Sequence, residues 1–186
     1  MTSVTDLTGP SHAAPAEAVL DRTAVRLDAT ATDRDDAIRQ CGQALVRVGA
    51  VEPAYIDTMI ERERSVSTYM GEGVAIPHGT LAGKDAVHRD AISVLRFPGE
   101  VDWDGNGVVL CIGIAARGAG HMRLLSELAQ ILLDPDRARA LRETSDVDEV
   151  MRLLQPVDEE DEEDEEDEED DGDVDEQDGD EEAETR

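Results

Sequence analysis

The stretch VVLCIGIA, residues 108–115, has no polar side chain at any of its eight positions. Apolar runs of this kind are typical of strands buried on both faces of a sheet, because a strand with one solvent-exposed face alternates apolar and polar residues. Burying both faces of a sheet requires helices on each side of it. The stretch therefore predicts an α/β fold in which helices flank a sheet on both faces.

The segments around this strand extend the same pattern. A second strand is expected at residues 91–97, AISVLRF, where polar Ser93 and Arg96 predict partial exposure. Val74 to Ile76 form a shorter apolar run that resembles a strand. Apolar residues recur at helical spacing in five further segments, which begin at Thr32, Pro53, His121, Asp136 and Ser145. Thr32 is expected to cap the first of these helices.

Charge divides the chain into three parts. The 186 residues carry a formal net charge of −29, of which residues 158–186 contribute −21, residues 23–157 contribute −6 and residues 1–22 contribute −2. The leader, residues 1–22, is rich in Thr, Ser, Ala and Pro and is expected to be flexible. The acidic tail, residues 158–186, is expected to be disordered because it has too few apolar side chains to offset the entropy cost of ordering. Residues 23–157 then form one domain, long enough to bury a single core.

Composition disfavours several classes of protein. The chain lacks the Lys and Arg excess that nucleic-acid binding requires. No apolar run approaches the roughly 20 residues that cross a bilayer, and the N-terminus has no signal-peptide pattern, so a cytoplasmic protein with no direct membrane insertion is expected. Cys41 and Cys111 lie within apolar patterns and are expected to be reduced core thiols.

Two histidines stand in informative positions. His78 follows the apolar run at residues 74–76 and is flanked by Pro77 and Gly79, which fix the backbone before it and let the chain turn after it. His121 follows a glycine-rich loop and opens an apolar helix, where backbone N–H groups and the helix dipole attract anions. Taken alone, a structural role is at least as common for such a histidine. Together the two positions indicate a candidate phosphate site.

Several stretches then carry a resemblance to a known family. They are VEPAYIDTMIER at residues 51–62, TYMGE at 68–72, VAIPHGT at 74–80, GIAAR at 113–117 with His121 shortly after, and TSDVDEV at 144–150. Over residues 23–155 the sequence resembles the IIA component of the fructose/mannitol family of the bacterial sugar phosphotransferase system. It is most similar to the mannitol-specific branch.

The resemblance implies a fold, partners and residue roles. The fold is a mixed sheet flanked by helices. His78 matches the histidine that is phosphorylated on its tele nitrogen, receiving the phosphoryl group from the phosphocarrier HPr and passing it to a cysteine of the cognate IIB component of a membrane permease. His121 matches a second histidine that supports the phosphoryl group, Arg62 the active-site arginine, and Glu72 a carboxylate that orients one of the imidazoles. No metal or cofactor is needed if an arginine, an imidazole and backbone N–H groups stabilise the charge.

Three alternatives stay open at this stage. The chain could be a regulatory IIA protein in which phosphorylated His78 is a signal, or a binding module whose acidic tail engages a basic partner. A metal site of His78, His121 and Glu72 is disfavoured because no paired ligand spacing such as HxxxH is present. The choice between mannitol and fructose rests on overall sequence similarity, since no residue of a IIA domain contacts the sugar.

Overall fold

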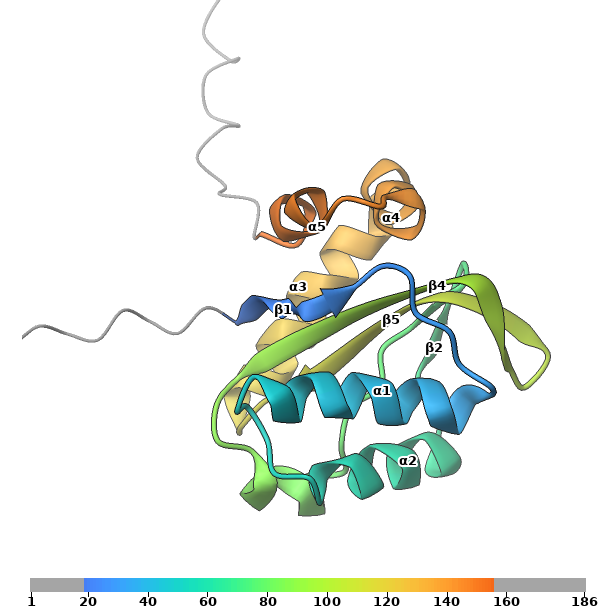
Figure 1. Cartoon of the computed structure of the whole chain (residues 1–186). Helices are drawn as coiled ribbons and strands as arrows, with labels where there is room; N and C mark the ends of the chain where they lie inside the picture. Colours follow the sequence, from blue (N-terminus) through green and yellow to red (C-terminus); the bar gives the residue numbers. More distant parts are fainter. Residues whose placement is uncertain (1–18, 156–186) are drawn as a thin grey trace, which may run out of the picture. The chain divides into compact units, whose positions relative to one another are not determined.

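A five-stranded mixed sheet lies at the centre of the domain (Figure 1). The computed structural model describes residues 19–155. The strands are β1 (Leu20–Arg26), β2 (Tyr69–Gly71), β3 (Val74–Ala75), β4 (Ala91–Trp103) and β5 (Asn106–Ala115), and their order across the sheet is β1-β4-β5-β3-β2. The β1–β4 and β3–β5 pairs are parallel, whereas the β4–β5 and β2–β3 pairs are antiparallel. The expected mixed sheet is confirmed.

Strand β5 is buried on both faces, as the sequence predicts. Leu110, Ile112 and Ile114 pack in the apolar cluster on one side of the sheet, and Cys111 and Ala115 pack in the cluster on the other. Each cluster is closed by helices, so the alternating side chains of one strand serve two separate cores.

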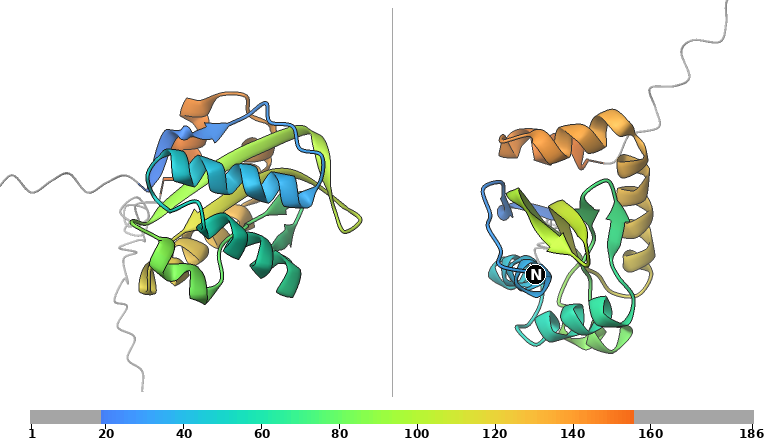
Figure 2. Two further views of the ribbon diagram at one scale, coloured as in Figure 1. Left: turned by 60° about the horizontal axis from the view of Figure 1, so that its bottom comes forward. Right: turned by 90° about the vertical axis from the view of Figure 1, so that its right-hand side faces the viewer.

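Helices cover the two faces in separate groups (Figure 2). α1 (Arg34–Arg47) and α2 (Tyr55–Ser65) lie on one face, and α3 (Ala119–Leu133), α4 (Pro135–Glu143) and α5 (Val147–Leu153) lie on the other. A short 3₁₀ helix, η1 (Leu81–Ala86), follows the His78 segment. Among the described residues, no helix combines the length and apolar character needed to cross a bilayer. The predicted arrangement of helices on both faces is confirmed.

Strand β4 differs from its prediction in exposure and in length. Ser93 is fully buried, because β4 lies between β1 and β5 rather than at an edge of the sheet. Its hydroxyl donates to the carbonyl of Cys41 at 3.2 Å, which satisfies the buried polar group. The strand also runs on to Trp103, past a bulge between Arg96 and Val101. The predicted partial exposure is therefore wrong for Ser93 and confirmed for Arg96, which is half-buried.

The start of the domain also differs from the prediction. β1 was not expected, and it begins at Leu20, within the segment assigned to the leader. The cap of α1 is Asp33, whose carboxylate accepts from the backbone N–H of Asp36 at 2.8 Å, and not Thr32. A carboxylate is a strong cap because it accepts from the orphan N–H groups and complements the helix dipole. The expected disorder of residues 158–186 lies outside the described residues.

Both cysteines are free and buried, as predicted. Burial is the main cause that raises the pKa of the Cys111 thiol well above its ordinary value, and contact with Cys41 adds to it. A raised pKa keeps the thiol protonated and lowers its reactivity. These residues are therefore core side chains.

Candidate active site

His78 is held at the end of a strand by the neighbouring strand. Its backbone bridges to Ile114 in parallel, and the N–H of Ile114 donates to the carbonyl of Pro77 at 2.9 Å. The buried hydroxyl of Tyr55 ties the same region, donating to the carbonyl of Ile114 and accepting from the N–H of Gly79, both at 2.9 Å. His78 therefore projects from a backbone that is fixed on both sides.

Gly79 allows this close approach. A Cβ atom at Gly79 would lie 2.5 Å from Cε2 of Tyr55 and 2.6 Å from the hydroxyl oxygen of Thr58, closer than real Cβ atoms come. A larger residue would push the tyrosine ring away and break its bond to the Gly79 N–H. The glycine of the motif at residues 74–80 is thus required by packing against α2.

The tautomer of His78 follows from one hydrogen bond. Nδ1 lies 2.8 Å from the carbonyl oxygen of Ile76. Because a carbonyl only accepts, Nδ1 carries the proton in the neutral ring, and Nε2 carries the lone pair. The tele nitrogen is consequently the ring atom with a free lone pair.

His121 and Arg62 face His78. The rings of His78 and His121 have centroids 4.9 Å apart and are tilted by 54°. Arg62, near the end of α2, donates from Nη1 to the carbonyl of Val66 at 2.7 Å, which fixes its guanidinium beside the histidines. The glycine-rich loop, with Gly118 at φ 51°, places His121 in the first turn of α3. Residues far apart in sequence thus meet at one point, as the sequence predicts for these three side chains.

All three side chains line one cavity of about 890 Å³. It lies between the His78 segment on one side and α3 on the other, and Ser67, Thr68 and Lys84 also line it. Its rim carries apolar side chains that are strongly exposed, among them Met70, Leu81 and Met122. A polar centre with an exposed apolar rim is typical of a site that acts on a group presented by another protein.

The environment keeps both imidazoles neutral. Burial is the main cause that lowers the pKa of His78, with further lowering by the charges of His121 and Arg62. Burial and then Arg62 lower the pKa of His121 as well. A neutral imidazole is a nucleophile, whereas a protonated one is not. Lowered pKa values are therefore suited to nucleophilic chemistry at neutral pH.

We expect the same shifts to make the protein less stable as the pH falls below neutrality. The folded pKa of both histidines lies below the unfolded value of about 6.5. The free energy of unfolding therefore keeps its full value above pH 6.5. It decreases as the pH falls toward the folded pKa values of the two histidines, because the unfolded chain binds protons first. Urea unfolding at pH 7.5, 6.5 and 5.5 measures this slope. A double variant His78→Gln, His121→Gln should flatten it, and an equally steep slope in that variant would contradict the assignment.

Glu72 does not join this site. It lies in the turn between β2 and β3 at φ 51°, and its side chain is exposed. It lines a different, smaller cavity of about 180 Å³, together with Leu132, Leu133 and Arg142. The structure therefore does not bring Glu72 to the histidines. Within residues 19–155, no three His, Cys, Asp or Glu side chains are placed to hold a metal ion.

The carboxylate near His78 belongs to Glu63, which was not among the predicted site residues. Glu63 is 3% exposed, and its charge raises the pKa of His78 against the dominant effect of burial. Its spacing offered a signal, since Glu63 follows the buried residues Tyr55 and Met59 at intervals of four. Helical residues four apart share a face, so Glu63 belongs to the buried face of α2.

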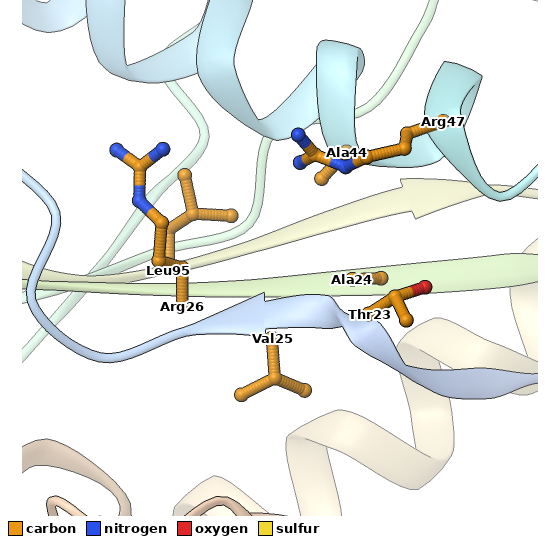
Figure 3. A pocket seen from close by; sticks show the side chains of 7 residues that line it. All are labelled: Thr23, Ala24, Val25, Arg26, Ala44, Arg47 and Leu95. Carbon is orange, nitrogen blue, oxygen red and sulfur yellow. The ribbon is translucent and has the colours of Figure 1, made fainter.

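A third cavity, of about 250 Å³, is a cleft between β1 and α1 (Figure 3). Ala24 and Leu95 are among its lining residues, and Arg26 and Arg47 contribute guanidinium groups from β1 and α1. No histidine, cysteine or carboxylate lines it. Thr23 contributes a hydroxyl to it, but no residue that could act as a general base lines the cleft, and the histidine pocket is the candidate active site.

Comparison with known proteins agrees with this site. A mannitol-specific phosphotransferase enzyme IIA component of Halalkalibacterium halodurans is 38% identical over 141 residues, covering 76% of this chain and 97% of that protein. A PTS system mannitol-specific EIICBA component of Pasteurella multocida is 41% identical over 163 residues, which cover 83% of this chain but 26% of that longer protein.

The solved structures include a complex of enzyme IIA-mannitol with phosphorylated enzyme IIB-mannitol from Escherichia coli. It is 36% identical with a TM-score of 0.66, covering 71% of this chain and 94% of the matched chain. The sequence profile of one family matches residues 18–156, which include all of the described residues. The chain belongs to the EIIA 2 family of the phosphoenolpyruvate-dependent sugar phosphotransferase system.

Proposed function

We propose that this chain is a phosphoryl carrier in which His78 accepts a phosphoryl group from phosphorylated HPr and donates it to a cysteine of a cognate IIB component. The observation that carries the proposal is the hydrogen bond from Nδ1 of His78 to the Ile76 carbonyl. It leaves the Nε2 lone pair as the nucleophile in a pocket that also contains an arginine and a second imidazole. The similarity to a IIA chain in complex with phosphorylated IIB supports a IIB component as the partner in transfer.

The transfer needs no proton to move at His78. The Nε2 lone pair attacks phosphorus, and the bond from phosphorus to the donor nitrogen breaks with its electron pair returning to the donor ring. Nδ1 keeps its proton and its bond to Ile76 throughout. Donation to IIB then breaks the Nε2–P bond, and the cysteine thiolate forms the new bond to phosphorus.

The neighbouring groups stabilise charge on the transferred group. Arg62 supplies a guanidinium that suits phosphoryl oxygens, and His121 supplies an N–H donor from the first turn of α3. The N-terminus of that helix adds the favourable end of its dipole. In this proposal Arg62 and His121 bind the phosphoryl group and His78 alone carries it.

The partners fit the rim of the cavity. Met70, Leu81 and Met122 are 57%, 85% and 68% exposed, and they surround the pocket with apolar surface that a docking protein would bury. The route ends in uptake and phosphorylation of a sugar alcohol, with mannitol favoured by the relatives at 38% and 41% identity. The cytoplasmic location that the sequence predicts stays part of the proposal.

Incubation with enzyme I, HPr and labelled phosphoenolpyruvate tests the proposal. The chain is expected to take up one phosphoryl group per molecule in an acid-labile, base-stable form, which is the signature of phosphohistidine. Adding the IIB component of a mannitol permease should discharge the label to IIB. A chain that takes up no label, or that takes up acid-stable label, would refute the carrier function.

The discharge step separates transport from regulation. A carrier passes its phosphoryl group to IIB at the rate of sugar phosphorylation. A regulatory protein would be labelled in the first step and would keep its label in the presence of IIB.

A further inference from the structure

Glu63 is a fully buried carboxylate that accepts hydrogen bonds from several donors. Its oxygens accept from the hydroxyl of Ser67 at 2.9 Å, the backbone N–H of Thr68 at 2.8 Å and the indole N–H of Trp103 at 2.7 Å. The hydroxyl of Thr68 also donates to it, and a guanidinium nitrogen of Arg34 lies 4.0 Å away. A buried carboxylate is tolerated only when its lone pairs are satisfied in this way. The donors come from three separate parts of the chain, so Glu63 joins them.

A chain of hydrogen bonds leads from Glu63 to the nucleophile. Glu63 fixes the N–H of Thr68, the carbonyl of Thr68 accepts from the N–H of Ile76 at 2.9 Å, and the carbonyl of Ile76 accepts from Nδ1 of His78 at 2.8 Å. The N–H and the carbonyl of Thr68 belong to the two peptide groups on either side of its Cα, and the same is true of Ile76, so each bond restrains the residue that makes the next one. The orientation of the imidazole ring therefore depends on where Glu63 holds residue 68.

The same carboxylate shapes the wall of the cavity. Ser67 and Thr68 both line the pocket and both donate to Glu63. Arg62 holds the same segment from the other side through the carbonyl of Val66. The segment at residues 65–68 thus accepts the hydrogen bond of Arg62 at Val66. At Thr68 it also begins the series of hydrogen bonds that ends at His78.

We propose that Glu63 is a positioning residue for phosphoryl transfer, which holds the segment at residues 65–68 and, through Thr68 and Ile76, keeps the His78 ring with its proton on Nδ1 and its lone pair on Nε2. The inference rests on the proposed function, because it concerns the histidine that is proposed to carry the phosphoryl group. Glu63 does not touch that group itself.

An amide cannot replace the carboxylate in this place. Four N–H and O–H donors converge on the two oxygens of Glu63, and a glutamine would turn its own N–H₂ group toward some of them. Because an amide nitrogen cannot accept, either the backbone N–H of Thr68 or the indole N–H of Trp103 would lose its acceptor and the side chain would have to shift, while its size would stay the same. Glu63→Gln therefore changes positioning with little change in volume.

The test compares Glu63→Gln with two matched variants in the full chain. Glu61→Gln makes the same chemical change at an exposed position of α2, two residues away. Trp103→Phe removes one hydrogen bond to Glu63 and some core volume but leaves both bonds to Thr68 in place. It therefore lowers stability without releasing the segment at residues 65–68.

We expect Glu63→Gln to take up phosphate about ten- to a hundredfold more slowly than the unmodified chain, because misplacement of a reacting group by about 1 Å has effects of this size. The KM for phosphorylated HPr should stay unchanged. Glu61→Gln and Trp103→Phe, assayed below their Tm values, should react at nearly the normal rate. Equal losses in Glu63→Gln and Trp103→Phe would overturn the inference, since stability alone would then explain them.

The tautomer of His78 provides a second test. If Glu63 only stabilised the fold, replacing it would not change which ring nitrogen of His78 carries the proton. Long-range ¹H–¹⁵N spectra of the histidine ring should show the proton on Nδ1 in the unmodified chain and in Trp103→Phe. In Glu63→Gln they should show a mixture with the Nε2–H form. An unchanged tautomer together with an unchanged rate would refute the positioning role.

The two proposals fail in different ways. If the unmodified chain takes up no label, the carrier function is wrong, whatever Glu63 does. If the unmodified chain is labelled on His78 and Glu63→Gln is labelled equally fast, only the positioning role is wrong.

Discussion

Replacing His78 by alanine is expected to abolish phosphoryl uptake from HPr, with a rate loss of more than about a thousandfold. The variant lacks the His78 ring, in which the hydrogen bond at Nδ1 leaves the lone pair on Nε2 free in a pocket that His121 and Arg62 also line. His121 does not replace it, because its proposed role is to donate to the phosphoryl oxygens. Incorporation of label from phosphoenolpyruvate, followed over time, measures the loss.

His88→Ala is the matched control for this prediction. His88 is an exposed histidine that does not line the histidine pocket, and its nearest charged partner is Glu52 at 3.8 Å. This variant should be labelled as fast as the unmodified chain. Acid-labile label that persists in His78→Ala, with circular dichroism unchanged, would move the phosphorylated residue elsewhere.

Replacing Arg62 by glutamine is expected to slow phosphoryl uptake about a hundredfold, because a preorganised donor to the transferred group is removed. The variant should also raise the pKa values of His78 and His121. Burial is the main cause that lowers them and would remain, but the charge of Arg62 adds to the lowering at both rings. The rate constant and an NMR titration of both histidines measure the two effects separately.

Arg64→Gln provides the control, since Arg64 lies two residues further on and pairs with Asp35 on the exposed surface. It should alter neither the rate nor the histidine pKa values. If Arg62→Gln behaved like Arg64→Gln in both measurements, Arg62 would be a structural residue that only holds the carbonyl of Val66.

Local pattern predicted the layers of the fold because burial leaves a periodic mark on a sequence. The apolar run at residues 108–115 indicated a strand buried on both faces. In the structure its side chains pack in two separate cores, one on each side of the sheet. The pattern failed for Ser93, since a polar residue in a strand is buried when a backbone carbonyl satisfies it. It also failed for β1, whose residues 20–26 contain Asp, Arg and Thr among few apolar side chains.

The candidate site was predicted in part. The position of His78 between Pro77 and Gly79 and the place of His121 at a helix start are local features, so the sequence indicated both. The selection of Glu72 followed a resemblance, and the structure places this residue in a turn that lines another cavity. Glu63 stood in a run of alternating charges that reads as an exposed helix end, although its spacing from Tyr55 and Met59 marked the buried face.

The sequence by itself determined the class of the fold and the family, and it indicated His78 as the proposed nucleophile, because each of these depends on residues that are near one another in the chain. Only the tertiary structure decided which carboxylate is connected to His78 by hydrogen bonds. Glu63, Thr68, Trp103 and His78 lie as many as 40 residues apart, and hydrogen bonds among them form only when α2, β3 and the β4–β5 hairpin pack together. A hydrogen bond depends on distances of a few tenths of an ångström, and packing of separate elements sets such distances where spacing along the chain does not.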